Sequence, residues 1–159
     1  MKRCIIMQGL PGSGKSTLAT RLAAEVPGAA ICSADHYMIT GGRYKFALTK
    51  VAAAHNYCQS QAYDAMMAGC SLVVIDNTNI RAWEAKEYVL IAMEHGYDIE
   101  FRRPNTEWAF DVEECFKRNQ HGCPKEVIVR MNSRIEDLTI ATCLEAKSPW
   151  EQRVSEEYV

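Results

Sequence analysis

A glycine-rich segment near the start of the chain carries residue types that could hold a nucleoside triphosphate. Residues 9–17 read Gly-Leu-Pro-Gly-Ser-Gly-Lys-Ser-Thr, which fits the phosphate-loop pattern G-x-x-x-x-G-K-[ST], and they directly follow the apolar residues 4–7. Glycines let backbone N–H groups converge on phosphates, and a helix starting near Lys15 adds its positive N-terminal end. We expect Lys15 to reach the β- and γ-phosphates of ATP and Ser16 to ligate Mg²⁺. A dinucleotide fingerprint is excluded, because Thr17 stands where its third glycine would be.

Two aspartates stand at the carboxyl ends of predicted strands, where open α/β sheets place ligand-binding groups. Asp35 is a candidate general base that takes the proton of an attacking hydroxyl, although a helix cap or a turn also uses an aspartate in this way. Asp76 is placed to support Mg²⁺, directly or through water, and the same structural alternative applies to it. Asn77 follows Asp76 where motor-type ATPases have a water-activating glutamate, which argues against simple hydrolysis. The absence of an N-K-x-D motif argues against a GTPase.

A basic, turn-forming stretch suggests a lid over the phosphates. We place this lid at about residues 117–125, between two predicted helices, with Arg118 as the cation that stabilises the transferring phosphoryl group. Arg130 lies on the helix that follows the lid. It either contacts phosphate or forms an ordinary i, i+4 ion pair with Glu126.

The pattern of apolar runs and breakers predicts the elements that position these groups. Short apolar strands alternate with amphipathic helices, which is typical of a βαβ chain with a parallel sheet. We predict an α/β fold of the P-loop NTPase kinase type: a three-layer α/β/α sandwich with a mainly parallel sheet of four or five strands and a helical lid. The predicted strands are residues 4–7, 29–33, 71–76 and 97–102, and the predicted helices are residues 15–26, 47–68, 81–95, 106–119 and 124–137. Trp150, Val154 and Tyr158 share one helical face, which predicts a short C-terminal helix packed back on the domain.

Length and composition describe one globular domain over residues 1–159. The net charge of −2 argues against extended contacts with nucleic acid but leaves room for local ones. The 7 cysteines show no C-x-x-C pair, so we interpret them as reduced thiols rather than metal ligands or disulfides. No apolar run approaches the roughly 18 residues of a membrane span, so we expect a cytoplasmic protein without a membrane partner. The sequence gives no oligomeric state.

The ordered set of motifs resembles the P-loop polynucleotide 5′-hydroxyl kinase family, phage-type kinases included, within the wider zeta-toxin and adenylate-kinase-like group. The matching segments are residues 9–17, Ser33-Ala34-Asp35-His36-Tyr37, residues 74–79 and Lys117-Arg118-Asn119, before a helix with Arg130. The resemblance implies Mg²⁺-dependent transfer of the ATP γ-phosphate to a nucleic-acid hydroxyl, with Lys15, Asp35 and Arg118 as catalytic residues. The residues expected to hold the nucleotide are Gly9, Pro11, Gly12, Ser13, Gly14, Lys15, Ser16, Thr17 and Arg118; those expected at the metal are Ser16 and Asp76; those expected at the acceptor are Asp35, Arg43, Asp76, Thr78, Asn79 and Arg130.

Two departures from the family pattern leave the acceptor open. Met38 stands where the family commonly has an arginine for the substrate phosphate, and Arg43 or Lys45 could replace that contact. Residues 120–122, Gln-His-Gly, replace a second lid arginine. A chain-end 5′-hydroxyl of DNA or RNA is the first expectation.

Three alternatives to a chain-end acceptor stay open. One is the hydroxymethyl group of a modified DNA base such as 5-hydroxymethyluracil, as in DNA modification by phages, with the flipped base stacked near Tyr37, Tyr44 and Phe46. A second is a nucleoside or sugar acceptor. A third, a nucleotide-binding switch or adaptor without catalysis, is disfavoured by Asp35 in the acceptor position.

Overall fold

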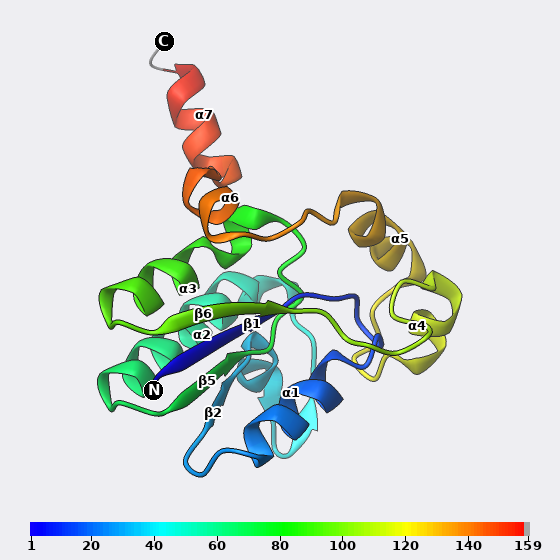
Figure 1. Ribbon diagram of the computed structural model, residues 1–159. Coiled ribbons are helices and arrows are strands. Elements are labelled where there is room, and N and C mark those ends of the chain that lie inside the picture. The colour runs from blue at the N-terminus through cyan, green and yellow to red at the C-terminus, as the bar shows by residue number, and fades with distance from the viewer. Residues whose placement is uncertain (158–159) are drawn as a thin grey trace.

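A four-stranded parallel sheet forms the centre of the computed structural model, which describes residues 1–157 (Figure 1). The strands lie in the order β2-β5-β1-β6, so the first strand is central and pairs with β5 and β6 through Ile5, which faces Val74 on one side and Glu100 on the other. The sheet consists of β1 (Arg3–Met7), β2 (Ala30–Cys32), β5 (Leu72–Ile75) and β6 (Asp98–Arg102). All four predicted strands are confirmed. Short apolar runs are typical of parallel strands that helices bury on both faces.

Helices cover both faces of the sheet and complete the predicted three-layer fold (Figure 1). On one face, α1 (Lys15–Ala24) packs Ala19 against Ile5 and Val74, with Leu18 and Leu22 closing the cluster. On the other face lie α2 (Val51–Met67), α3 (Ala82–Glu94) and α6 (Ile140–Glu145), of which only α6 was not predicted.

The two helices predicted on either side of the lid, residues 106–119 and 124–137, are both shorter than predicted. These are α4 (Val112–Arg118) and α5 (Lys125–Arg134). The predicted start of the first helix at residue 106 is wrong, because the Asp111 side chain accepts a hydrogen bond from the Glu114 N–H and begins α4 there. Residues 106–111 run instead along the phosphate loop. A third apolar cluster, centred on Leu10, Cys115 and Ile128, joins the lid helices to the body.

The connection between β2 and α2 folds into short elements that the sequence did not predict. They are the 3₁₀ helix η1 (Ala34–Met38) and the hairpin strands β3 (Ile39–Thr40) and β4 (Arg43–Tyr44). The helix predicted from residue 47 begins as the 3₁₀ helix η2 (Leu48–Lys50) and becomes α-helical at Val51. The hairpin turn uses Gly41 and Gly42 at φ 59° and 77°, a conformation that favours glycine. This segment builds one wall of the candidate site.

The predicted C-terminal helix is present as α7 (Pro149–Glu157), but it projects away from the sheet (Figure 1). Trp150 is 68% exposed, so the expectation that this residue packs back on the domain is wrong. Glu151 of α7 forms an ion pair with Lys86 of α3, at 3.8 Å. Tyr158 and the side chain of Val154, the other members of that predicted face, lie outside what the structure describes.

The seven cysteines are free thiols, as the sequence predicts. Burial raises the pKa of Cys4 and of Cys32 to about 12, so both behave as small apolar side chains. Within residues 1–157, no helix combines the length and the apolar character that crossing a membrane requires.

Candidate active site

The phosphate loop is pressed against the segment that precedes α4. The Thr106 hydroxyl donates to the Ser13 carbonyl at 2.7 Å, and the Trp108 indole N–H donates to the Gly12 carbonyl at 3.1 Å. Two glycines are needed for this approach. A Cβ on Gly12 would lie 2.1 Å from the Cys115 carbonyl oxygen, and one on Gly14 would lie 2.7 Å from the Thr106 methyl group. The loop conformation is therefore fixed by tertiary contacts before any ligand binds.

The start of α1 offers unpaired donors to an anion. Gly14 occupies the N-cap at φ 96° with no side-chain cap, and the first turn contains no acidic residue. The first N–H groups of a helix have no partner within the helix, so here they are left for a ligand. The Ser13 hydroxyl is buried and has no hydrogen-bond partner among the described residues. This cradle fits a phosphate chain.

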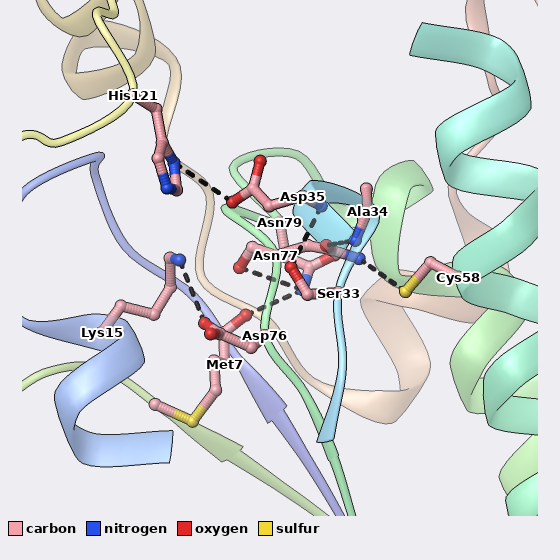
Figure 2. A network of polar contacts seen from close by, with 10 residues as sticks. All are labelled: Met7, Lys15, Ser33, Ala34, Asp35, Cys58, Asp76, Asn77, Asn79 and His121. Carbon is pink, nitrogen blue, oxygen red and sulfur yellow. Dashed lines mark hydrogen bonds and ion pairs between the residues drawn. The ribbon is translucent and has the colours of Figure 1, made fainter. Parts of the chain in front are cut away.

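Lys15 and Asp76 meet at the carboxyl end of the central strands (Figure 2). The Lys15 ammonium lies 3.1 Å from an Asp76 carboxylate oxygen, and both side chains are 9% exposed. The sequence analysis assigned Lys15 to the phosphates and Asp76 to the metal, and the structure brings the two side chains together. Within residues 1–157 no group of three or more histidine, cysteine or acidic side chains is clustered enough to hold a metal alone. Ser16 and Asp76 offer hard oxygen donors, which fits a Mg²⁺ ion that takes its other ligands from phosphates and water.

Asp35 is held in place through its backbone while its carboxylate stays accessible. The Ser33 hydroxyl accepts from the Asp35 N–H at 3.1 Å, and the Asn77 amide oxygen accepts from the Ala34 N–H at 2.9 Å. Asn77 is itself fixed, because its amide donates to the buried Tyr88 hydroxyl at 3.2 Å. The Asp35 side chain remains 41% exposed. A carboxylate that is positioned but open to solvent suits a proton acceptor for an incoming group.

The lid loop reaches across to Asp35 (Figure 2). His121 Nδ1 lies 3.4 Å from Asp35 Oδ2, and the imidazole stacks on the Tyr44 ring with centroids 4.0 Å apart. Burial, together with the charge of Asp35 and an interaction of its carboxylate with the phenol, raises the pKa of Tyr44 to about 12. Tyr44 is therefore a neutral donor beside a carboxylate. His121 and Tyr44 join the acceptor side of the site through contacts between segments far apart in sequence.

The structure places Arg118 beside the phosphate loop through an intermediary ring. Its guanidinium carbon lies 3.6 Å from the centroid of Trp108, whose indole bonds to Gly12, and its Nε lies 2.8 Å from Glu114. The Trp108 ring thus connects Arg118 to the phosphate loop, and the guanidinium group forms an ion pair with Glu114 of the same helix.

The remaining candidate residues have different surroundings. The Thr78 carbonyl accepts from the Gly9 N–H, and the buried Asn79 amide donates to the Met7 carbonyl at 2.8 Å, so both support the loop. Arg43 and Arg130 are exposed. The structure has no ion pair between Arg130 and Glu126 among its described residues.

Gln8 is a supporting residue that the sequence did not point to. It is 2% exposed, and its amide donates to the carbonyls of Asn79 and Glu136, at 2.9 and 2.7 Å. Its side-chain oxygen accepts from Arg103 at 2.7 Å. Gln8 therefore ties the entrance of the phosphate loop to the chain beyond the lid. A lone polar residue at the end of an apolar strand was its only signal.

The model of the AAA domain family matches residues 4–138 of this chain. Human NEDD4-binding protein 2 is 42% identical over 127 residues, which cover 80% of this chain and 7% of that protein. Mouse 2′,3′-cyclic-nucleotide 3′-phosphodiesterase is 31% identical over 145 residues, covering 85% of this chain and 31% of that protein. The chain therefore spans a minor part of either relative.

A chain of the Pnkp1/Rnl/Hen1 RNA repair complex shares the fold. It superimposes with a TM-score of 0.56 at 21% sequence identity, over 99% of this chain and 46% of that chain. At this identity the likeness concerns the arrangement of helices and strands.

Proposed function

The chain belongs to the AAA domain family and has the fold of a P-loop kinase, and from this premise we propose that it transfers the γ-phosphate of ATP to a hydroxyl group of a nucleic acid. The acceptor we propose is the 5′-hydroxyl at the end of a DNA or RNA strand. One observation carries the proposal: an anchored, accessible Asp35 at the carboxyl end of β2, on the same edge of the sheet as the Lys15–Asp76 pair. Such a carboxylate argues against a nucleotide switch or adaptor.

The residues divide the reaction between two sides of the site. On one side, the N–H groups at the start of α1 and Lys15 bind the phosphates, and Ser16 and Asp76 are the residues that would hold Mg²⁺, which neutralises phosphate charge when bound. On the other side, Asp35 takes the proton of the acceptor hydroxyl while the hydroxyl oxygen forms the new bond to the γ-phosphorus. The bond from that phosphorus to the bridging oxygen breaks, and ADP leaves.

The names of the relatives support nucleic acid as the acceptor class. One relative is a phosphodiesterase for 2′,3′-cyclic nucleotides, and the structural match lies in an RNA repair complex. The first name concerns nucleotides and the second concerns RNA. The Asp35 side chain, beside Tyr44 and His121, is 41% exposed, which lets a polymer end approach it.

Transfer of label from γ-labelled ATP tests the proposal with three acceptors in parallel. These are 5′-hydroxyl oligonucleotides, hydroxymethylated DNA with blocked ends, and a panel of nucleosides and sugars. Label on the oligonucleotide ends supports the proposal. Label inside the blocked DNA would make the protein a base kinase, and label on small molecules alone would reject a nucleic-acid acceptor.

The variant Asp35→Asn tests the proton acceptor. We expect turnover to fall by about 10²–10⁴-fold, because a neutral amide cannot take the hydroxyl proton. ATP affinity, measured by calorimetry, should be unchanged, since Asp35 lies on the acceptor side. Turnover close to that of the unmodified protein would reject Asp35 as the general base.

A further inference from the structure

The chain beyond Asp35 has an unusual charge distribution for a protein of net charge −2. No aspartate or glutamate occurs between Asp35 and Asp64, whereas the same stretch contains Arg43, Lys45 and Lys50. All three cations are exposed, and among the described residues no carboxylate lies within ion-pair distance of them. This contrasts with Arg118 on the lid, which is paired. The acceptor side is therefore a locally positive area whose charge is not neutralised by the protein.

Exposed aromatic rings lie in the same stretch. Tyr37 is 39% exposed, Phe46 is 60% exposed and Tyr57 is 41% exposed. Tyr37 on η1 and Tyr57 on α2 are neighbours, with ring centroids 5.5 Å apart and planes inclined at 48°. Leaving such rings in water forgoes the stabilisation that burial would bring, so a stretch that combines exposed rings with unpaired cations points to a ligand.

We propose that this area binds a single-stranded nucleic acid that leads away from Asp35, an inference that rests on the proposed function and adds the track followed by its substrate. We call the area the strand-binding surface. It consists of the rings of Tyr37, Phe46 and Tyr57 and the cations Arg43, Lys45 and Lys50.

The strand-binding surface adjoins Asp35 through the hairpin that carries Tyr44. Tyr44 follows Arg43 on β4, faces Asp35 and stacks on His121. The Lys45 N–H donates to the Met38 carbonyl at 2.9 Å, which ties the hairpin to η1. A strand whose terminal hydroxyl reaches Asp35 therefore lies beside the hairpin that carries Arg43.

Charge and ring faces together select a single strand as the occupant. Unpaired bases present flat faces that stack on aromatic side chains regardless of sequence, and the phosphates between them bind cations. In a duplex the base faces are stacked on each other, so the rings would gain no contact. An acidic peptide would use the cations and leave the rings unused.

Binding of a fluorescent 5′-hydroxyl oligonucleotide of about 10 nucleotides, without ATP, tests the surface on the whole chain. The matched pair is Tyr57→Ala and Tyr63→Ala, because both tyrosines lie on α2 and Tyr63 is 43% exposed. We expect Tyr57→Ala to raise the Kd about tenfold and Tyr63→Ala to leave it unchanged. Phe46→Ala, at a more exposed ring, should act like Tyr57→Ala and guards against a folding defect. Equal effects of Tyr57→Ala and Tyr63→Ala would overturn the proposal.

A second pair tests the charge. Arg43→Gln should reduce the slope of log Kd against log salt by about 0.7, the value for one phosphate contact on a single strand. Arg21→Gln, an exposed arginine on α1, should leave the slope unchanged. A blunt duplex that binds as tightly as the single strand, or an acidic peptide that displaces the strand from the unmodified protein at equal charge concentration, would overturn the single-strand assignment.

The outcomes separate this inference from the proposed kinase activity. Binding that depends on Tyr57, without phosphate transfer to any acceptor, keeps the surface and rejects the kinase. Transfer to strand ends with a KM that Tyr57→Ala does not change keeps the kinase and rejects the surface. The strand-binding surface requires the Tyr57 dependence of the Kd. Where transfer occurs, it also requires a lower KM for the oligonucleotide than for a mononucleotide acceptor.

Discussion

The two walls of the candidate site differ in how firmly the protein holds them. The nucleotide wall, residues 9–17, is hydrogen-bonded to Thr106 and Trp108, and Lys15 is buried. The acceptor wall, residues 34–50, consists of two 3₁₀ helices and a hairpin whose strands have 2 residues each. Its Leu48 is 78% exposed. A rigid phosphate cradle needs little reorganisation during phosphoryl transfer. An open wall leaves acceptor choice to a few exposed side chains.

The largest effect expected from this contrast is the loss of activity in Lys15→Met. The substitution removes the cation that faces the transferring phosphoryl group, so kcat should fall by about 10²–10³-fold or more. Label transfer from ATP measures the effect, and circular dichroism controls for folding. Substitutions of the exposed rings and cations on the acceptor wall, by contrast, should alter the KM for the acceptor. If Lys15→Met raised only the acceptor KM, the division of the site into two walls would be wrong.

Glycine substitutions compare the rigidity of the two walls directly. Gly12 has φ 78° and its Cβ would collide with the Cys115 carbonyl, whereas Gly41 has φ 59° and open space around it. Gly12→Ala should therefore destabilise the fold by about 3 kcal/mol or more, from backbone strain and overlap together. Gly41→Ala should cost about 1–2 kcal/mol from backbone strain alone. Urea unfolding measures both, and equal costs would show that α4 does not press on the phosphate loop.

The smallest expected effect is a change in high-pH behaviour on the acceptor wall. The pKa of Tyr44 is raised from 10.0 to about 12, so the neutral phenol stabilises the folded state. This contribution is complete below pH 10 and is lost as the pH rises through about 12. Tyr44→Phe should reduce the fall in the free energy of unfolding between pH 10 and about 12. Urea unfolding at a series of pH values measures this fall.

Asp35→Asn provides the control for this titration. Because the Asp35 charge contributes to the shift, the variant should lower the pKa of Tyr44 while the part caused by burial remains. Tyrosinate absorbance, compared with that of Tyr44→Phe, isolates this group from the buried Tyr88. An unchanged pKa would mean that the phenol does not face the carboxylate.

The same contrast explains what the sequence could predict. The nucleotide wall is encoded locally: an apolar strand, glycines at fixed offsets and Lys15 occur within a few residues, and Asp76 follows the most apolar strand. The acceptor wall depends on contacts between distant segments. The sequence pointed to Asp35, but its partner His121 comes from the lid, and neither residue carries a local signal for the other.

Competing local signals explain the remaining differences. The helical spacing of residues 106–119 suggested one long helix, yet its first part binds the phosphate loop through Thr106 and Trp108. The start of α4 was readable from Asp111 followed by Glu114, a pattern typical of an N-cap. The hairpin after η1 was not readable, because two-residue strands lack any alternation to detect.

The contact of Trp108 with the Gly12 carbonyl and with Arg118 gives the protein an internal optical reporter. The emission of an indole depends on its hydrogen bond and on charges at its ring face. Here the hydrogen-bond acceptor, Gly12, belongs to the nucleotide wall, and the charge, Arg118, ends α4. The other two tryptophans, Trp83 and Trp150, lie on α3 and α7. Phenylalanine at those two positions would leave a single fluorophore, with which the arrival of a nucleotide can be timed without any label.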